Sequence, residues 1–170
     1  MANFEDALTF VLRNEDPHLS GAVTEDSGGR TRFGIAERFH ADLGAEFYSG
    51  ETDAALERAR EIYRSQYWQA VRGDEITDQR VATKLLDMAV NMGVRQAVVL
   101  CQRAVNAMGT VRIAEDGICG HQTLAAINRC NASALSVHLC EACAVFYQHL
   151  AAVRPEAQHY LRGWLARARA

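Results

Sequence analysis

The sequence has no long hydrophobic run, and its N-terminus has no basic stretch followed by an apolar one. No apolar run approaches about 20 residues, the length that a helix needs to cross a bilayer. We therefore expect no membrane insertion. Because Met1–Asp6 does not read as a secretory signal, we expect synthesis in the cytoplasm without a signal peptide. A protein of this kind that acts outside the cytoplasm must leave by another route, such as lysis or a dedicated secretion machine.

The chain also has no excess of basic residues, and it has few prolines. Lys and Arg number 18 against 21 Asp and Glu, and this net charge of −3 argues against a nucleic-acid partner. Only two prolines occur in 170 residues, and 49% of the residues are hydrophobic. A chain of this length can bury one sizeable core and is short for two. We predict a single, mainly α domain over residues 1–170, with a small β-hairpin in its N-terminal third, and we expect a monomer.

Apolar residues recur at helical spacing along most of the chain. Residues 16–32 interrupt this pattern with three glycines, which is typical of a loop or a small hairpin. Thr77 can cap one helix, and Asn131 or Ser133 can cap another. The expected helices are 3–14, 34–43, 53–67, 78–92, 94–108, 121–129, one reaching to about 153, and a last one that starts at Pro155.

Glu15 is the candidate general acid. Cleavage of a glycosidic bond needs a carboxylic acid that protonates the leaving oxygen, and a second polar group that manages water or the developing cation. Pro17 ends the first helix near Asp16, so Glu15 lies at a helix C-terminus, where the dipole disfavours a second anion. Neighbours such as Leu12 and Phe33 would hold the proton more tightly by excluding water. The alternative is a solvated glutamate at a fraying helix end.

The second carboxylate is Glu25 or Asp26, and the sequence does not decide between them. Either could orient water or stabilise positive charge on the sugar, and the hydroxyl of Thr31 could position that water. Gly29, in a Gly-Gly pair, lets the backbone turn sharply and approach a bulky polysaccharide. The alternative is a surface turn with solvated acids.

Several motifs, in order over about three quarters of the chain, carry a family resemblance. They are Glu15, Asp26, the run 28–35 (GGRTRFGI), the run 62–68 (IYRSQYW) and the run 86–93 (LDMAVNMG). Together they resemble the N-acetylmuramidases of glycoside hydrolase family 108. The resemblance implies a lysozyme-like helical fold without a cofactor. It also implies hydrolysis of the bond between N-acetylmuramic acid and N-acetylglucosamine in peptidoglycan, with Glu15 as the catalytic glutamate.

The C-terminal part carries a second resemblance. Residues 116–124 (DGICGHQTL) resemble the peptidoglycan-binding portion found in the same family. This divides the domain into a catalytic part, 1–93, and a helical part, 94–170, and it implies peptidoglycan glycan strands as the partner.

One departure from the family pattern follows Glu15. The family has Gly-Gly there, and this chain has Asp16-Pro17. The variant loop, the missing signal peptide and the small single domain together resemble muramidase effectors of the type VI secretion system. That resemblance implies an antibacterial toxin that acts in the periplasm or cell wall of a target cell, with a periplasmic immunity protein as a partner.

The remaining candidates are substrate contacts and a basic tail. Phe33 and Trp68 are candidates for sugar contact, and the indole of Trp68 is suited to stacking, although aromatics on amphipathic helices also pack in cores. Asn91 shares a helix face with Asp87, so it either contacts substrate or serves with Asp87 as a buried polar support. The basic C-terminal residues predict a solvated helix face: Arg162, Arg167 and Arg169.

Five cysteines allow other interpretations. They are either buried free thiols or members of one or two disulfides. His138, Cys140, Cys143 and His149 lie on one segment, whereas a closed zinc site usually draws on two, so we expect no metal. Two other functions remain open: a non-catalytic peptidoglycan-binding module, and a cysteine-dependent peptidoglycan amidase with Cys119 or Cys101 as its nucleophile.

Overall fold

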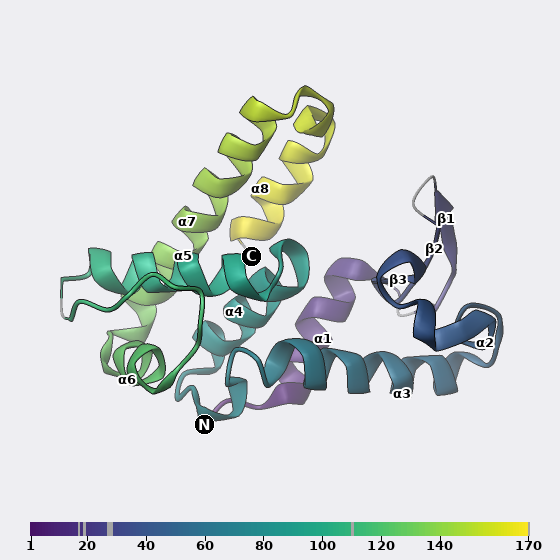
Figure 1. The fold of residues 1–170 in the computed structure, drawn as a ribbon, viewed down its shortest axis with the longest axis horizontal. Helices are drawn as coiled ribbons and strands as arrows, with labels where there is room; N and C mark the ends of the chain where they lie inside the picture. The colour runs from purple at the N-terminus through teal and green to yellow at the C-terminus, as the bar shows by residue number, and fades with distance from the viewer. Residues whose placement is uncertain (17, 19, 27–28, 110, 170) are drawn as a thin grey trace.

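Helix α4, Gln79–Met92, lies at the centre of the protein in the computed structural model, which describes all residues except 17, 19, 27–28, 110 and 170 (Figure 1). Eight of its residues are buried, and α1, α5 and α7 pack against it. The other helices are α1 (Phe4–Glu15), α2 (Gly44–Ser49), α3 (Thr52–Ile62), α5 (Val94–Ala107), α6 (His121–Arg129), α7 (Ala132–Val153) and α8 (Leu161–Arg169). The mainly α expectation is confirmed.

A small antiparallel sheet follows α1, in the N-terminal third where the hairpin was predicted. It consists of β1 (Thr24–Asp26), β2 (Gly29–Arg32) and β3 (Ile35–Ala36), in the order β1-β2-β3. Figure 1 shows β1 and β2 standing out from the helical body above α2 and α3.

The buried side chain of Arg32 ties this sheet to the corner between α2 and α3. Its Nε donates to the carbonyl of Gly21 at 2.9 Å, and its Nη1 donates to the carbonyls of Phe47 and Gly50 at 2.8 and 3.0 Å. Its Nη2 donates to Thr52 Oγ1 at 3.0 Å. One guanidinium therefore donates to three backbone carbonyls and one hydroxyl.

The helix expected over 34–43 is wrong. Gly34 has φ +76°, which ends any helical path, and Ile35 then pairs with Arg32 across β2 and β3. Two short 3₁₀ turns follow, at Glu37–Phe39 and Ala41–Leu43, and α2 begins at Gly44, where the predicted helix was to end.

The helix predicted over 53–67 is confirmed, but it changes its winding. α3 continues into a π-helical segment, η3 (Tyr63–Trp68), whose wider turns bury both Tyr63 and Trp68. The cap predicted for α4 is also corrected. Asp78, and not Thr77, accepts hydrogen bonds from the backbone N–H groups of Arg80 and Val81.

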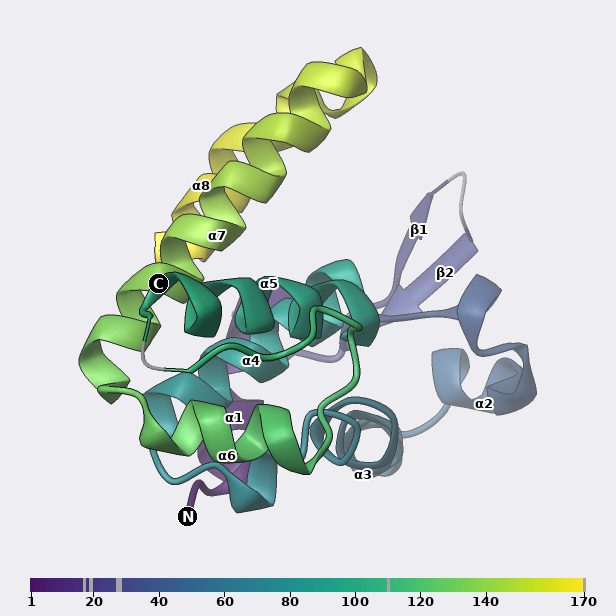
Figure 2. The ribbon, with the colours of Figure 1, turned by 60° about the vertical axis from the view of Figure 1, so that its left-hand side comes forward.

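The C-terminal part ends in an antiparallel hairpin of α7 and α8, joined by a 3₁₀ helix at Pro155–Tyr160. Figure 2 shows this hairpin reaching away from the body, with α8 leading back toward it. Of the two predicted cap residues, Asn131 and Ser133, Asn131 caps α7 and accepts a hydrogen bond from the N–H of Ala134. None of the described helices combines the length and apolar character needed to span a bilayer.

Candidate active site

Glu15 is the last residue of α1 and is held by a residue from the other end of the chain. Arg167 of α8 donates from Nη1 to Glu15 Oε1 at 2.7 Å. The Glu15 side chain is 22% exposed. This residue is therefore engaged in the fold and reaches the surface in part, which differs from a solvated glutamate at a frayed helix end.

The turn between β2 and β3 packs directly on Glu15. A Cβ atom on Gly34 would lie 2.6 Å from Tyr63 Oη and 2.8 Å from Glu15 Cγ, so only glycine fits at this position. The hydroxyl of Tyr63 donates to the Phe33 carbonyl at 2.8 Å. Burial raises the pKa of Tyr63, and the negative charge of Glu15 raises it further. Tyr63 therefore stays a hydroxyl donor and fixes the turn beside the carboxylate.

Arg167 also binds Asp87, one of the two polar residues predicted on α4. Its Nε donates to Asp87 Oδ1 at 2.8 Å. Asn14 donates to the same oxygen at 3.2 Å, and Lys84 Nζ lies 3.8 Å from Asp87 Oδ2. Asp87 is only 2% exposed, so Arg167 and Lys84 balance its charge inside the protein.

The assignment of Arg167 to a solvated helix face is wrong. Its side chain is 13% exposed, whereas Arg162 and Arg169 are exposed. Burial acts to lower the pKa of Arg167, but the charges of Asp87 and Glu15 and the hydrogen bonds to both raise it above its ordinary value. One signal for this burial was present: Arg167 follows Trp164 by three residues, which places both on one helix face.

Asn91 lies one turn beyond Asp87 on α4 and is bound to α7. Its Oδ1 accepts a hydrogen bond from the hydroxyl of Tyr147 at 2.6 Å. Tyr147 stacks on Trp164 of α8, with ring centroids 5.3 Å apart. Asn91 is half-buried, so this amide links α4 to the C-terminal hairpin and still reaches the surface.

The candidates on the sheet lie at paired positions. Glu25 is exposed and stands opposite Arg30, whose guanidinium binds Glu37 at 2.6 Å. Thr31 is half-buried and stands opposite Thr24 on β1.

The glycine turn and Asp26 complete this strand pair. Gly29 has φ +99° and pairs with the backbone of Asp26. The side chain of Asp26 lies outside the described part of the chain, as does Gly28.

Two of the predicted sugar contacts are buried. Trp68 is 0% exposed, packs on Phe4 with ring centroids 5.6 Å apart, and lies against Gly73. Phe33 is 2% exposed, and its ring lies against Gly21. Neither side chain presents a face on which a sugar could stack, so these two assignments are wrong. Both aromatics instead pack in the core.

All five cysteines are free thiols. Burial is the main cause that raises the pKa of Cys119 to about 11 and the pKa of Cys143 to about 12. Burial likewise raises the pKa of Cys101. Cys101 and Cys119 are both buried, and burial disfavours the thiolate, which is the nucleophilic form.

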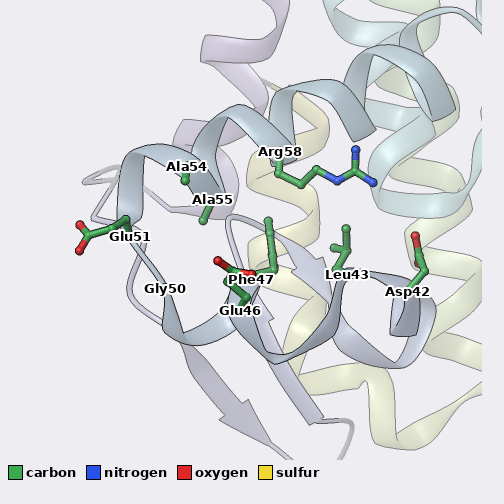
Figure 3. A pocket seen from close by; sticks show the side chains of 9 residues that line it. All are labelled: Asp42, Leu43, Glu46, Phe47, Gly50, Glu51, Ala54, Ala55 and Arg58. Carbon is green, nitrogen blue, oxygen red and sulfur yellow. The ribbon is translucent and has the colours of Figure 1, made fainter.

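A cavity of about 400 Å³ lies between α2 and α3. Figure 3 shows Ala55 and Arg58 of α3 on one side of it, and Leu43 and Phe47 on the other. Glu15 is not among its lining residues. This cavity is therefore separate from the cluster around Glu15.

Comparisons with known proteins agree with this arrangement. Residues 9–93, half of the chain, match the family model described as Glycosyl hydrolase 108, and residues 96–169 match one described as Predicted Peptidoglycan domain. The solved structure of SagA from Brucella abortus is similar, with a TM-score of 0.66 and 26% sequence identity. The similarity covers 98% of this chain and 96% of that one. The comparison with curated proteins gives no match. The chain has a lysozyme-like fold, belongs to the glycosyl hydrolase 108 family and is a glycoside hydrolase that acts on peptidoglycan.

Proposed function

We propose that the protein is a muramidase, which cleaves the glycan strand between N-acetylmuramic acid and N-acetylglucosamine, with Glu15 as its general acid. Membership of the glycosyl hydrolase 108 family supports this proposal. The observation that carries it is the position of Glu15: a partly exposed carboxyl at a helix end, backed by Gly34 and Tyr63 and joined to Arg167.

The proposed reaction begins with proton transfer. Glu15 gives its proton to the glycosidic oxygen as the bond from that oxygen to the anomeric carbon breaks. A water then adds to the anomeric carbon, and its proton passes to a carboxylate. Glu25 or Asp26 provides the second carboxylate, and Thr31 orients the water. When Glu15 carries its proton on Oε2, its Oε1 still accepts the hydrogen bond from Arg167, which also binds Asp87.

We assign contacts with the glycan to two further residues. Gly29 carries no side chain, so the glycan can approach the protein backbone closely at this position. Asn91 is half-buried and held by Tyr147, so its amide is fixed in place for a hydrogen bond with a sugar.

Digestion of purified sacculi tests this proposal. The soluble fragments are reduced with borohydride and their masses measured, since reduced muramic acid at the new ends identifies a muramidase and reduced glucosamine identifies a different glycosidase. Glu15→Gln is expected to lower the rate by about 100-fold or more, because a general acid contributes roughly 10²–10⁴-fold. Glu57→Gln is the control, since its side chain is 70% exposed on α3.

The same digestion separates the other functions. New free amines with intact glycan strands would indicate an amidase. Co-sedimentation with sacculi without soluble products would indicate a binding module. Equal rates for the wild type and Glu15→Gln would remove Glu15 from the mechanism.

The antibacterial role is a separate proposal, supported by the resemblance to type VI secretion effectors. We expect lysis when the protein is directed to the periplasm of a Gram-negative host, and no lysis when it stays in the cytoplasm. An immunity protein would prevent this lysis when produced in the same periplasm. Absence of lysis by the wild-type protein in the periplasm would contradict a lytic effector, and lysis by Glu15→Gln at the wild-type level would contradict Glu15 as the general acid.

A further inference from the structure

We propose that Arg167 is a positioning residue for Glu15, so that the C-terminal helix α8 completes the active site. This inference rests on the proposed function, because it concerns the same carboxyl group.

The first argument is that α4 holds residue 167 at two points. Lys84 Nζ donates to the backbone carbonyl of Arg167 at 2.8 Å, and Asp87 accepts from its Nε at 2.8 Å. Both α4 residues are buried, with side-chain exposures of 6% and 3%. The place of the guanidinium is thus set by α4. The third contact, to Glu15, therefore fixes the carboxylate with respect to the arginine.

The second argument is that the hydrogen bond to Arg167 restricts a side chain that would otherwise be flexible, that of Glu15. Glu15 is the last residue of α1, where the helix no longer constrains the chain that follows. A glutamate side chain has several rotatable bonds, and ordering it costs conformational entropy. A fixed guanidinium that binds Oε1 selects one of its orientations. A general acid must lie within hydrogen-bond reach of the leaving oxygen, so this selection bears on the rate.

The third argument is that the cluster is a poor device for stability alone. It takes two cations, Lys84 and Arg167, and two carboxylates, Glu15 and Asp87, largely out of water. The cost of removing such charges from water offsets much of their attraction. In addition, Nη2 of Arg167 is buried and has no hydrogen-bond partner within the described part of the chain, and an unpaired buried donor costs free energy.

The fourth argument is that the cluster joins the two family segments. Glu15, Lys84 and Asp87 lie in the segment matched by the glycosyl hydrolase model, and Arg167 lies in the segment matched by the peptidoglycan model. Asn91 and Tyr147 form a second polar link between the same two segments. The C-terminal segment therefore contributes a residue to the site itself.

Kinetics of Arg167 variants on soluble, uncrosslinked peptidoglycan strands test the inference. Arg167→Ala is expected to lower kcat by about 10- to 100-fold, as misplacement of a reacting group does. KM and co-sedimentation with sacculi are expected to stay within about twofold of the wild type, since no substrate contact is removed. Added guanidinium ion, at concentrations that do not denature the protein, is expected to restore kcat several-fold. Arg162→Ala, an exposed arginine on the same helix, is the matched control.

Arg167→Lys keeps the inference testable if Arg167→Ala fails to fold. Lysine keeps the charge but has no fork that can bridge two carboxylates, so we expect a folded protein with reduced kcat. Wild-type kcat in either folded variant would overturn the inference, as would a loss in Arg167→Ala that guanidinium does not rescue. Inactive wild-type protein would refute the proposed function and this inference with it. An active wild type with an equally active Arg167→Ala would refute only the role of Arg167.

Discussion

At the scale of single residues, the site depends on a position where only glycine fits. Gly34 has φ +76° and touches both Glu15 and Tyr63. The motif around Gly34 was visible in the sequence, and so was the position of Glu15 at the end of a helix. The contact between them was not visible, because it depends on a strand turn folding back onto a helix.

Gly34→Ala is therefore expected to destabilise the protein by about 2–4 kcal/mol, since backbone strain and a steric clash act together. We also expect a lower hydrolysis rate, because the displaced Tyr63 and Glu15 border the site. Chemical denaturation and sacculus digestion measure the two effects.

Gly44→Ala separates strain from packing. Gly44 has φ +67°, but nothing lies within 4 Å of the Cβ position that alanine would add. We expect Gly44→Ala to lower the free energy of unfolding by the backbone strain alone, about 1–3 kcal/mol. We expect the hydrolysis rate to stay unchanged. Equal effects of the two substitutions would show that contact with Glu15 and Tyr63 does not matter.

At the scale of elements, α4 matters most, because it carries Lys84, Asp87 and Asn91 on one length of helix. Its apolar stripe made it predictable from the sequence. Its cap was misassigned by one residue, since Thr77 and Asp78 are both good capping residues. Packing decided between them. The backbone N–H and the hydroxyl of Thr77 both donate to Asn128 Oδ1 of α6, at 3.0 and 3.3 Å, and Asp78 caps the helix.

Asp78→Ala is expected to lower the unfolding free energy by about 1 kcal/mol, and Asp78→Asn by less, because asparagine keeps a capping oxygen. The hydrogen bond from Arg80 is the main cause that lowers the pKa of Asp78 below its ordinary 3.8. The ionised form thus stabilises the fold at pH values above 3.8.

The wild type is therefore expected to have a higher free energy of unfolding than Asp78→Asn near neutral pH. This difference is lost as the pH falls from about 5 to below 3.8, through the lowered pKa of Asp78 in the folded state. Urea denaturation of the wild type and Asp78→Asn across that range measures it. If the difference in unfolding free energy between the two proteins does not shrink toward low pH, the role of the Asp78 charge is contradicted.

At the scale of the whole molecule, the two family segments form one core. α4, at the end of the first segment, packs against α5 and α7 of the second. Leu85 and Leu86 of α4 are both fully buried. The boundary near residue 93 is a boundary between motifs, and we propose that it does not separate two independently folding units.

Residues 1–93 produced alone are therefore expected not to fold. Exposure of each buried leucine costs about 1.5–3 kcal/mol, and a whole domain has a stability of only about 5–15 kcal/mol. Circular dichroism and urea denaturation of this fragment measure the outcome. Co-production with residues 94–170 is the control, since it can restore the shared core. A cooperative transition in the isolated fragment would contradict the single core.

The sequence by itself determined the helical class, most helix positions and the place of Glu15 at a helix end. These features depend on periodicity and on residues within a turn or two of each other. The tertiary structure alone decided that Trp68 is buried, that Ile35–Ala36 form a strand, and that Arg167 binds Glu15. That last pair is separated by 152 positions in the chain, and no local pattern encodes a contact that forms when α8 packs against α7 and Arg167 binds Asp87 of α4.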